Sequence, residues 1–364
     1  MINYSFIDLL NIMVANNSSD LIIKAGSPPI FRVNRALQRA ELQTLLPEDT
    51  YELTRQALNE DNFNELKVKF EKDAAYALSD IARFRINAFH QQGNYAMVIR
   101  LIKAEVPRIE KLTLPEIIYS IACIERGLIL VTGTTGSGKS TTLAAMINYM
   151  NENLNKHIIT IEDPIEFVHK DKSCIVTQRE VGFDTKSFHS ALVAAMRQNP
   201  DVILIGEMRD SETVDAALAA AETGHLVMST LHTINAAQTI NRILEFYEKD
   251  HHDQLRAQLS EYLMATISQR LVPKIDNSGV VPAIEIMFQT PMIKKLIVDN
   301  RIDKLKSIIH QGNNEGMQTF DQSLVALYKA GLVSEEEAAI RCTKPANFKL
   351  YCEGHYPDVE AGIV

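Results

Sequence analysis

Cysteine is scarce in this chain of 364 residues, with four in total, and no two of them form a CxxC pair. This spacing argues against both a zinc site and a disulfide framework, and it fits reduced thiols in the cytosol.

Long apolar runs and targeting signals are also missing. No stretch reaches the roughly 18 uninterrupted apolar residues of a membrane-spanning helix. No Lys or Arg precedes Asp8, and no small-residue cleavage pattern follows, so we expect no signal peptide. The sequence therefore predicts a cytoplasmic protein.

Basic residues are the minority among the charged ones. Lys and Arg number 37 against 46 Asp and Glu, which gives a net charge of −9. Proteins that bind the phosphate backbone usually carry a basic footprint, so we expect no nucleic acid as the main partner. Apolar and charged fractions of 46% and 23% are ordinary for a globular protein, and the length suffices for two domains.

The first predicted domain covers residues 1–103. Residues 81–89 alternate like a strand, and residues 95–102 read as its partner after a turn at 91–94. Phe84 faces one side of this strand and Arg83 the other. We therefore predict a small α/β domain with arginines on one face of its sheet.

The second predicted domain covers residues 118–364 and follows a linker at 104–117. Unbroken apolar runs separated by helical stretches are typical of a parallel sheet covered on both faces. Within this domain we predict a helical C-terminal subdomain at about 250–345 and a loose tail at 346–364. The apolar runs lie at 128–132, 158–161, 202–205 and 226–230.

The most informative motif lies between the run at 128–132 and a helical stretch, and it fits G-x-x-x-x-G-K-[ST]. Its glycines let backbone N–H groups surround phosphate oxygens, and the helix that follows points its positive end at the anion. Lys139 can reach the β- and γ-phosphates, and Ser140 can place its hydroxyl on Mg²⁺. We therefore predict that the chain binds ATP with Mg²⁺. The predicted binding residues are Gly133, Thr134, Thr135, Gly136, Ser137, Gly138, Lys139, Ser140 and Thr141.

Acidic residues follow two of the predicted strands. Glu207 comes after the run at 202–205, but Gly206 stands where many P-loop enzymes place a Mg²⁺-holding aspartate. We interpret Glu207 as the residue that polarises the attacking water.

A second acidic group follows the strand predicted at 158–161 and contains Glu162, Asp163 and Glu166. Ligands bind at the carboxyl ends of parallel strands, and three acids in five residues repel one another unless a cation lies among them. Together with Ser140 they predict a Mg²⁺ site, partly through water. An acidic surface turn is the alternative interpretation.

Two histidines lie at the ends of the strand predicted at 226–230. A single histidine is more often structural, but His225 and His232 are candidates for sensing the γ-phosphate. No partner ligands occur at zinc spacing.

Three arginines of the first domain have two interpretations. Taken locally, Arg83, Arg85 and Arg100 read as solvated strand residues. In a ring, one subunit's arginines could serve as arginine fingers at the γ-phosphate of its neighbour.

Many separate motifs, in one order, resemble the secretion and pilus ATPase superfamily, and in particular the PilT/PilU family of type IV pilus retraction ATPases. The resemblance runs from Ser19 to about residue 345. The segments that carry it are Pro28-Pro29, 82–85, 133–140, 160–166, 176–181, 206–210, 222–225, 230–232 and 316–321.

This resemblance implies a homohexameric ring of PAS-like N-terminal and RecA-like C-terminal domains, with ATP at the domain interface. It also implies that Glu166 and Glu207 act as catalytic acids and that His225 and His232 form the histidine pair of the family. Arg83, Arg85 and Arg100 would then complete the site.

The branch within the family depends on a few segments. Retraction motors usually carry an Ala-Ile-Arg-x-Leu-Ile-Arg-Glu box, and residues 292–299 lack both arginines. Residues 173–182 and 317–321 resemble the PilU branch, which implies an accessory role beside a PilT-like companion ATPase. The expected partners then include an inner-membrane pilus platform protein, contacted peripherally from the cytoplasm.

Alternative functions share the same chemistry. A principal PilT-like retraction ATPase is the nearest. Assembly and type II secretion ATPases typically carry a longer N-terminal region and a tetracysteine zinc module, which this sequence lacks. A nucleic-acid translocase would need a basic or aromatic groove for a single strand. A non-catalytic ring subunit is disfavoured because all the expected catalytic residues are present.

Overall fold

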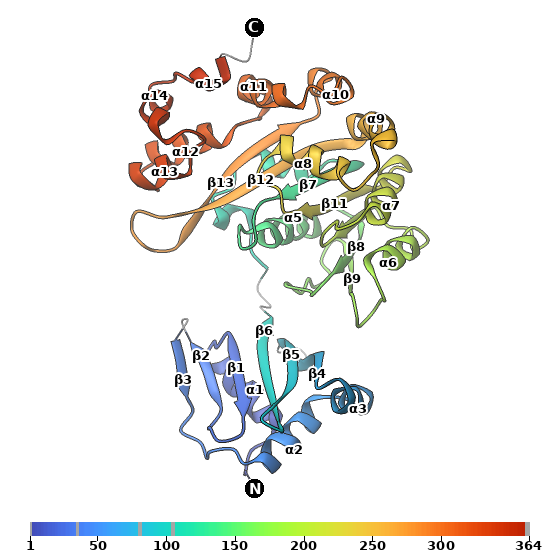
Figure 1. Ribbon diagram of the computed structural model, residues 1–364, viewed down its shortest axis with the longest axis vertical. Helices are drawn as coiled ribbons and strands as arrows, with labels where there is room; N and C mark the ends of the chain where they lie inside the picture. The colour runs from blue at the N-terminus through green and yellow to red at the C-terminus, as the bar shows by residue number, and fades with distance from the viewer. Residues whose placement is uncertain (1, 34–35, 79–81, 103–105, 361–364) are drawn as a thin grey trace. The chain divides into compact units, whose positions relative to one another are not determined.

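The computed structural model describes residues 2–33, 36–78, 82–102 and 106–360, and the chain divides into two compact units (Figure 1). The first unit contains Met1–Glu105 and Ile165–Val168, and the second contains Val106–Pro164 and His169–Val364. The predicted domain boundary at 103, the start of the predicted linker at 104 and the last four residues of the predicted tail lie outside the described residues.

The first unit is an antiparallel sheet with helices packed on one face. Its strand order is β3-β2-β1-β6-β5-β4. The strands are β1 (Asp20–Lys24), β2 (Ile30–Val33), β3 (Ala36–Arg39), β4 (Glu71–Leu78), β5 (Ala82–Gln91) and β6 (Asn94–Ile102). The helices are α1 (Phe6–Ala15), α2 (Pro47–Ala57) and α3 (Glu60–Lys69).

The hairpin of β5 and β6 confirms the two strands predicted from alternation. Phe84 and Ile86 of β5 are fully buried in the core under the helices, whereas the side chain of Arg85 between them faces outward. Gln92 and Gly93 form the turn, with φ of 51° and 78°. Two successive left-handed residues match the twist of the paired strands, which explains the tight connection.

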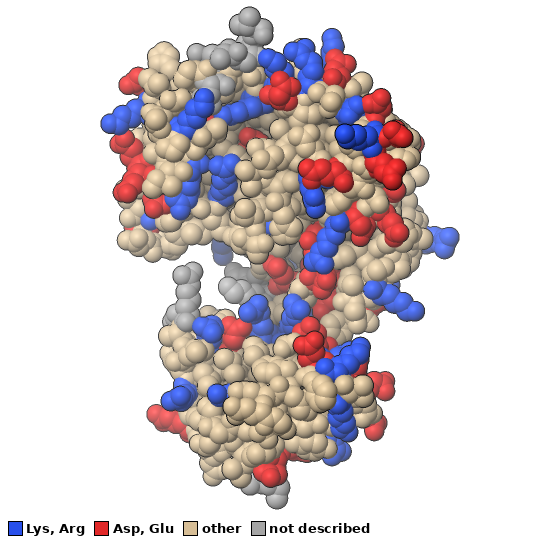
Figure 2. Space-filling model, in the orientation of Figure 1, with Lys and Arg blue, Asp and Glu red and all other residues tan. Residues whose placement is uncertain are grey.

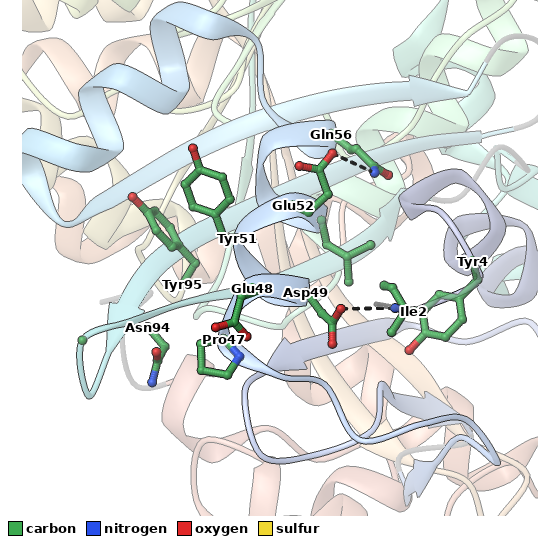
Figure 3. Close-up of a pocket in the computed structure, with 12 residues that line it drawn as sticks. Ile2, Tyr4, Pro47, Glu48, Asp49, Tyr51, Glu52, Gln56, Asn94 and Tyr95 are labelled. Atoms are coloured by element: carbon green, nitrogen blue, oxygen red, sulfur yellow. Dashed lines mark hydrogen bonds between the residues drawn. The ribbon is translucent and has the colours of Figure 1, made fainter.

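Helix α2 begins beside a cavity of about 570 Å³ in the first unit (Figure 3). Asp49 accepts hydrogen bonds from the backbone N–H of Leu46 at 2.9 Å and of Ile2 at 3.2 Å. Acidic residues in the first turn of a helix also interact favourably with the positive end of the helix dipole. Tyr51 and Tyr95 line the cavity, with ring centroids 5.5 Å apart. The acids at this position therefore stabilise the start of α2 and fix the N-terminal segment on it.

The second unit is a seven-stranded sheet covered on both faces. The strand order is β13-β12-β7-β11-β10-β8-β9, and every pair is parallel except β12 with β13. The strands are β7 (Gly127–Thr132), β8 (His157–Glu162), β9 (Ile175–Glu180), β10 (Val202–Ile205), β11 (Leu226–Leu231), β12 (Leu263–Pro273) and β13 (Val280–Phe288).

Alternate residues of the central strands enter the two cores. Leu128 and Leu130 of β7 pack on the side of α6–α11, whereas Ile129 and Val131 pack on the side of α4 and α5. Because both faces are buried, these strands read as unbroken apolar runs, as predicted. The helices are α4 (Ile117–Ala122), α5 (Lys139–Asn153), α6 (Phe188–Ala195), α7 (Ser211–Glu222), α8 (Ala236–Leu244), α9 (His252–Tyr262), α10 (Pro291–Val298) and α11 (Leu305–Gln311).

The region predicted as a helical subdomain contains two strands of the main sheet. The prediction was wrong at β12 because Thr266, Ser268 and Gln269 interrupt the apolar pattern, although each is at most 2% exposed. The Oγ atoms of Ser268 and Thr132 are hydrogen-bonded at 2.9 Å across β12 and β7. This hydrogen bond allows the polar Ser268 to occupy a buried position of β12, where the pattern predicted an apolar residue.

The predicted loose tail packs as ordered helices within the described residues. Phe348, Tyr351 and Val359 are each 1% exposed and share a core with Val272 of β12. Three large buried side chains offset the cost of ordering the chain, so the prediction of a loose tail was wrong up to residue 360. The helices that build this core are α12 (Phe320–Lys329), α13 (Glu335–Arg341), α14 (Phe348–Cys352) and α15 (Pro357–Glu360), and they lie over β12 and β13 in Figure 1.

Candidate nucleotide-binding site

A P-loop connects β7 to α5 in the second unit. The strand ends at Thr132 and the helix begins at Lys139, as the motif predicted. Gly133 has a φ of 145°, and a Cβ there would lie 2.5 Å from the backbone oxygen of Gln269 and would also meet the Ser137 hydroxyl. Only glycine fits this position, because the loop passes directly against β12.

Lys139 lies across the loop that precedes it. Its ammonium group donates hydrogen bonds to the carbonyl oxygens of Gly133 at 2.9 Å and Thr134 at 3.1 Å, and the residue is 8% exposed. Ser140 is half-buried in the first turn of α5. The positive charge, the helix N-terminus and a hydroxyl therefore gather at one turn, which is the donor set that suits phosphate with a bound Mg²⁺.

Strands β7, β11, β10 and β8 are parallel neighbours and end at the same edge of the sheet. Gly206, just beyond β10, donates its N–H to the Ile161 oxygen at 2.8 Å, and its own oxygen accepts from the Thr230 hydroxyl at 2.7 Å. A Cβ at Gly206 would lie 3.3 Å from the Ile161 oxygen. Glycine, where other P-loop enzymes carry an aspartate, thus avoids a tight contact with the end of β8.

Glu207 lies at this edge and contacts two basic side chains. Its Oε2 is 3.3 Å from Nε2 of His232, and its Oε1 forms an ion pair with Arg209. The hydrogen bond to Glu207 raises the pKa of Arg209, which remains charged. The Glu207 side chain is 16% exposed, whereas those of His232 and Arg209 are 55% and 62% exposed. The structure thus brings together Glu207 and His232, two of the residues predicted for catalysis.

Arg209 had no assigned role in the sequence analysis. It lies two residues after Glu207, and this spacing places both side chains beyond the end of β10. The only local feature of the sequence that could have indicated a role for Arg209 is its position close to an acid at the end of a predicted strand.

The acidic group after β8 does not form a metal cage of its own. Glu162 accepts hydrogen bonds from the hydroxyl of Thr160 at 2.6 Å and from Nε2 of Gln178 at 3.1 Å. Asp163 is exposed, and Glu166 is exposed in the Ile165–Val168 segment of the first unit. Across residues 2–33, 36–78, 82–102 and 106–360, no three His, Cys, Asp or Glu side chains gather in a group that could hold a metal. The three acids therefore do not form a preformed cage, and the predicted Mg²⁺ site, partly through water and together with Ser140, stays a prediction.

His225 lies away from the P-loop. It precedes β11, whereas His232 follows it, so a strand of six residues, about 20 Å long, separates them. Nδ1 of His225 is 3.0 Å from the Ala220 oxygen and 3.1 Å from the Thr223 hydroxyl. Within the subunit the structure therefore places only His232 at the P-loop edge of the sheet, because the ends of a strand lie at opposite edges.

The three predicted arginines share one face of the sheet in the first unit. Arg85 of β5 lies directly opposite Arg100 of β6, and Arg83 is two residues from Arg85 on the same strand. Nε of Arg100 is 3.0 Å from Oδ1 of the buried Asp20, and 70% of the Arg100 side chain is exposed. Arg85 is 3.9 Å from Asp73. Asp20 therefore holds Arg100 in place and leaves its guanidinium exposed to solvent.

Comparison with known proteins places this architecture in a family. The Type II/IV secretion system protein family model matches residues 64–346. The chain is 44% identical over 345 residues to the type IV pilus ATPase PilU of Pseudomonas aeruginosa, covering 95% of this chain and 90% of the relative. The chain belongs to the type IV pilus ATPase family. It is also 44% identical over 341 residues to the type IV pilus retraction ATPase PilT of the same organism, covering 94% of this chain and 99% of PilT.

The solved structures agree with this family. A crystal structure of the pilus retraction motor PilT with bound ADP matches with a TM-score of 0.89 and 42% identity, covering 96% of this chain and all of that one. This match confirms the predicted arrangement of a PAS-like N-terminal domain followed by a RecA-like ATPase domain, and the chain is an ATPase. Equal identity to PilU and PilT does not separate the two branches. Within the described part of the chain, no helix is long and apolar enough to cross a bilayer.

Proposed function

We propose that this chain is a cytoplasmic motor ATPase that powers or assists retraction of a type IV pilus. The observation that carries the proposal is the shared sheet edge, where the P-loop and the Glu207–His232 pair both lie. The 44% identity to PilU and PilT over almost the whole chain supports the pilus as the machine that it drives.

At this edge each side chain has a distinct task in ATP hydrolysis. Lys139 and the loop N–H groups bind and orient the phosphates, and Ser140 is placed to hold Mg²⁺. Bound Mg²⁺ would neutralise charge on the β- and γ-phosphates. Glu207 orients a water and takes its proton, once one carboxylate oxygen is released from Arg209 or His232. Glu162, Asp163 and Glu166 are proposed to act on the metal through water only.

We propose further that the ATPase works as a homohexamer, in which Arg83, Arg85 and Arg100 act on the nucleotide of a neighbouring subunit. The exposed guanidinium of Arg100, held by Asp20, is suited to such a contact. His225 has no place in the subunit's own P-loop site, so a role at the boundary between subunits is proposed for it.

Mixing two inactive variants tests the arginine assignment. Lys139→Ala and Arg100→Ala subunits, each nearly inactive alone, are expected to regain about one quarter of wild-type turnover when mixed in equal amounts, since one interface in four then combines intact partners. Phosphate release after subunit exchange measures this. A mixture of Lys139→Ala and Glu207→Gln is the matched control. It is expected to stay inactive, because both residues act in the site of the same subunit and no subunit of the mixture has both intact. No recovery in the first mixture would contradict an arginine acting between subunits.

For the cellular role we propose a PilU-like accessory ATPase that works with a PilT-like companion at an inner-membrane pilus platform protein. Lys and Arg are interspersed with Asp and Glu on the face in Figure 2, which argues against nucleic acid as the main partner. A PilT-like principal ATPase is the alternative.

Pilus retraction in living cells separates these roles. Removing this gene product should reduce retraction, and a Lys139→Ala strain should retract as long as the companion ATPase is active. Removing the companion should stop retraction although this chain remains intact. Retraction that continues without the companion would indicate a principal motor instead. A deletion strain that retracts with normal frequency and force would overturn the pilus role.

A further inference from the structure

Gln269 lies directly beside the P-loop, on a strand that is distant in sequence. Strand β12 runs parallel to β7, and Ser268 pairs with Thr132, the last residue of β7. The hydroxyls of these two residues are hydrogen-bonded at 2.9 Å. Gln269 therefore follows the last paired position, at the point where the neighbouring chain turns into the loop.

Gln269 contacts the loop at both of its ends. Its backbone oxygen would be 2.5 Å from a Cβ at Gly133, and its Nε2 would be 3.5 Å from a Cβ at Gly138. Nε2 also donates to the carbonyl oxygen of Ser137 at 3.4 Å. Gly133 is thus needed partly because Gln269 fills the space behind it, whereas Gly138 only touches the Gln269 side chain.

Two polar atoms at this contact have no hydrogen-bond partner among the described residues. They are Oε1 of Gln269 and the hydroxyl of Ser137, in residues that are 2% and 3% exposed. Leaving a buried acceptor or hydroxyl unsatisfied costs the desolvation of that group without a compensating hydrogen bond, and native proteins rarely tolerate it without a functional reason. One of these atoms is an acceptor and the other can donate, so each can satisfy the other.

We propose that Gln269 is a positioning residue for the P-loop. Its Nε2 holds the Ser137 carbonyl from behind, so that the loop N–H groups face the phosphates. When the loop closes on a nucleotide, the Ser137 hydroxyl donates to Oε1 of Gln269, and both atoms become satisfied. Gln269 itself does not touch the nucleotide. This inference rests on the proposed binding of ATP at the P-loop.

The next residue anchors β12 on its other side. The guanidinium of Arg270 lies 4.0 Å from the ring centroid of Phe320 in α12 and donates to the Arg341 oxygen at 2.9 Å. Leu271 lies 3.7 Å from the Cβ position of Gly138. The short segment 268–271 therefore joins the P-loop to the C-terminal helices and holds Gln269 in place beside the loop.

A double-mutant cycle on nucleotide affinity tests the inference. The variants are Gln269→Met, which keeps the length of the side chain, Ser137→Ala, and the two combined. Each single change is expected to weaken binding of a fluorescent ADP analogue about 3- to 10-fold, the effect of one hydrogen bond. The double variant should be weakened about as much as Gln269→Met alone and not by the product of the two factors, because Gln269→Met already removes the contact to the Ser137 hydroxyl that Ser137→Ala removes.

Gln289→Met is the matched control. Nε2 of Gln289 also donates to backbone carbonyls, those of Ser260 and Glu261 at 2.8 and 2.7 Å, but not to the P-loop. Its nucleotide affinity should equal that of the wild type. Melting temperatures without nucleotide identify a purely structural effect: a lower melting temperature with unchanged affinity in Gln269→Met would overturn the inference, as would multiplicative effects in the double variant. A wild-type protein that binds no nucleotide would instead refute the proposed function.

Discussion

Replacing Lys139 by alanine is expected to lower ATP hydrolysis by the purified protein by a factor of about 100 to 1,000, the cost of losing one preorganised electrostatic contact. The ammonium group lies within the loop itself, 2.9 Å from the Gly133 oxygen, and helix α5 begins at this residue. No other lysine lies on the loop at residues 133–139. Phosphate release at saturating Mg·ATP measures the change, and titration with a fluorescent analogue measures the accompanying loss of affinity.

Lys156→Ala is the control for this experiment. Lys156 precedes β8 at the opposite edge of the sheet and lies 3.9 Å from Asp201. Its removal should leave turnover within about twofold of the wild type, because surface ion pairs contribute little. Equal turnover in Lys139→Ala and Lys156→Ala would contradict the assignment of the P-loop as the site of hydrolysis.

Replacing Glu207 by glutamine is expected to separate binding from chemistry. The amide fits the same space but cannot accept a proton from water, so hydrolysis should fall by about 100- to 10,000-fold, the usual contribution of a general base. ATP affinity should remain within a few-fold of the wild type, because Glu207 lies beyond β10 and the P-loop follows β7, with β11 between the two strands. Single-turnover phosphate release together with equilibrium binding distinguishes the two effects.

Glu212→Gln serves as the matched control for Glu207→Gln. Glu212 is an exposed acid in the first turn of α7, five residues further along the chain. It should behave like the wild type in both measurements. If Glu207→Gln kept full turnover, another acid would have to activate the water, and Glu166 would become the first candidate.

Much of the site was predictable because its chemistry is local in sequence. The P-loop needs a strand, glycines, a lysine and a helix in immediate succession, and all of them are visible in residues 128–140. Glu207 and His232 were predictable as neighbours because parallel strands end at a common edge. The same geometry predicts that His225, which precedes β11, lies at the opposite edge of the sheet from His232, which follows it.

The parts that could not be predicted depend on long-range pairing. Gln269 reaches the P-loop only because β12 pairs with β7, and the buried polar residues of β12 hide its strand pattern. Similarly, Arg100 is held by Asp20, which is 80 residues away and becomes its neighbour through the pairing of β1 with β6. Neither contact has a signal in the spacing of nearby residues.

The central claim is that residues 133–140 bind a triphosphate whose hydrolysis involves Glu207 at the same sheet edge. Titrating the purified full-length chain with a fluorescent ATP analogue in millimolar Mg²⁺, with and without excess ADP as competitor, tests it most directly. We expect saturable, Mg²⁺-dependent binding that ADP displaces and that Lys139→Ala weakens strongly. A folded wild-type protein that neither binds the analogue nor releases phosphate from ATP, even with a PilT-like companion added, would contradict the account.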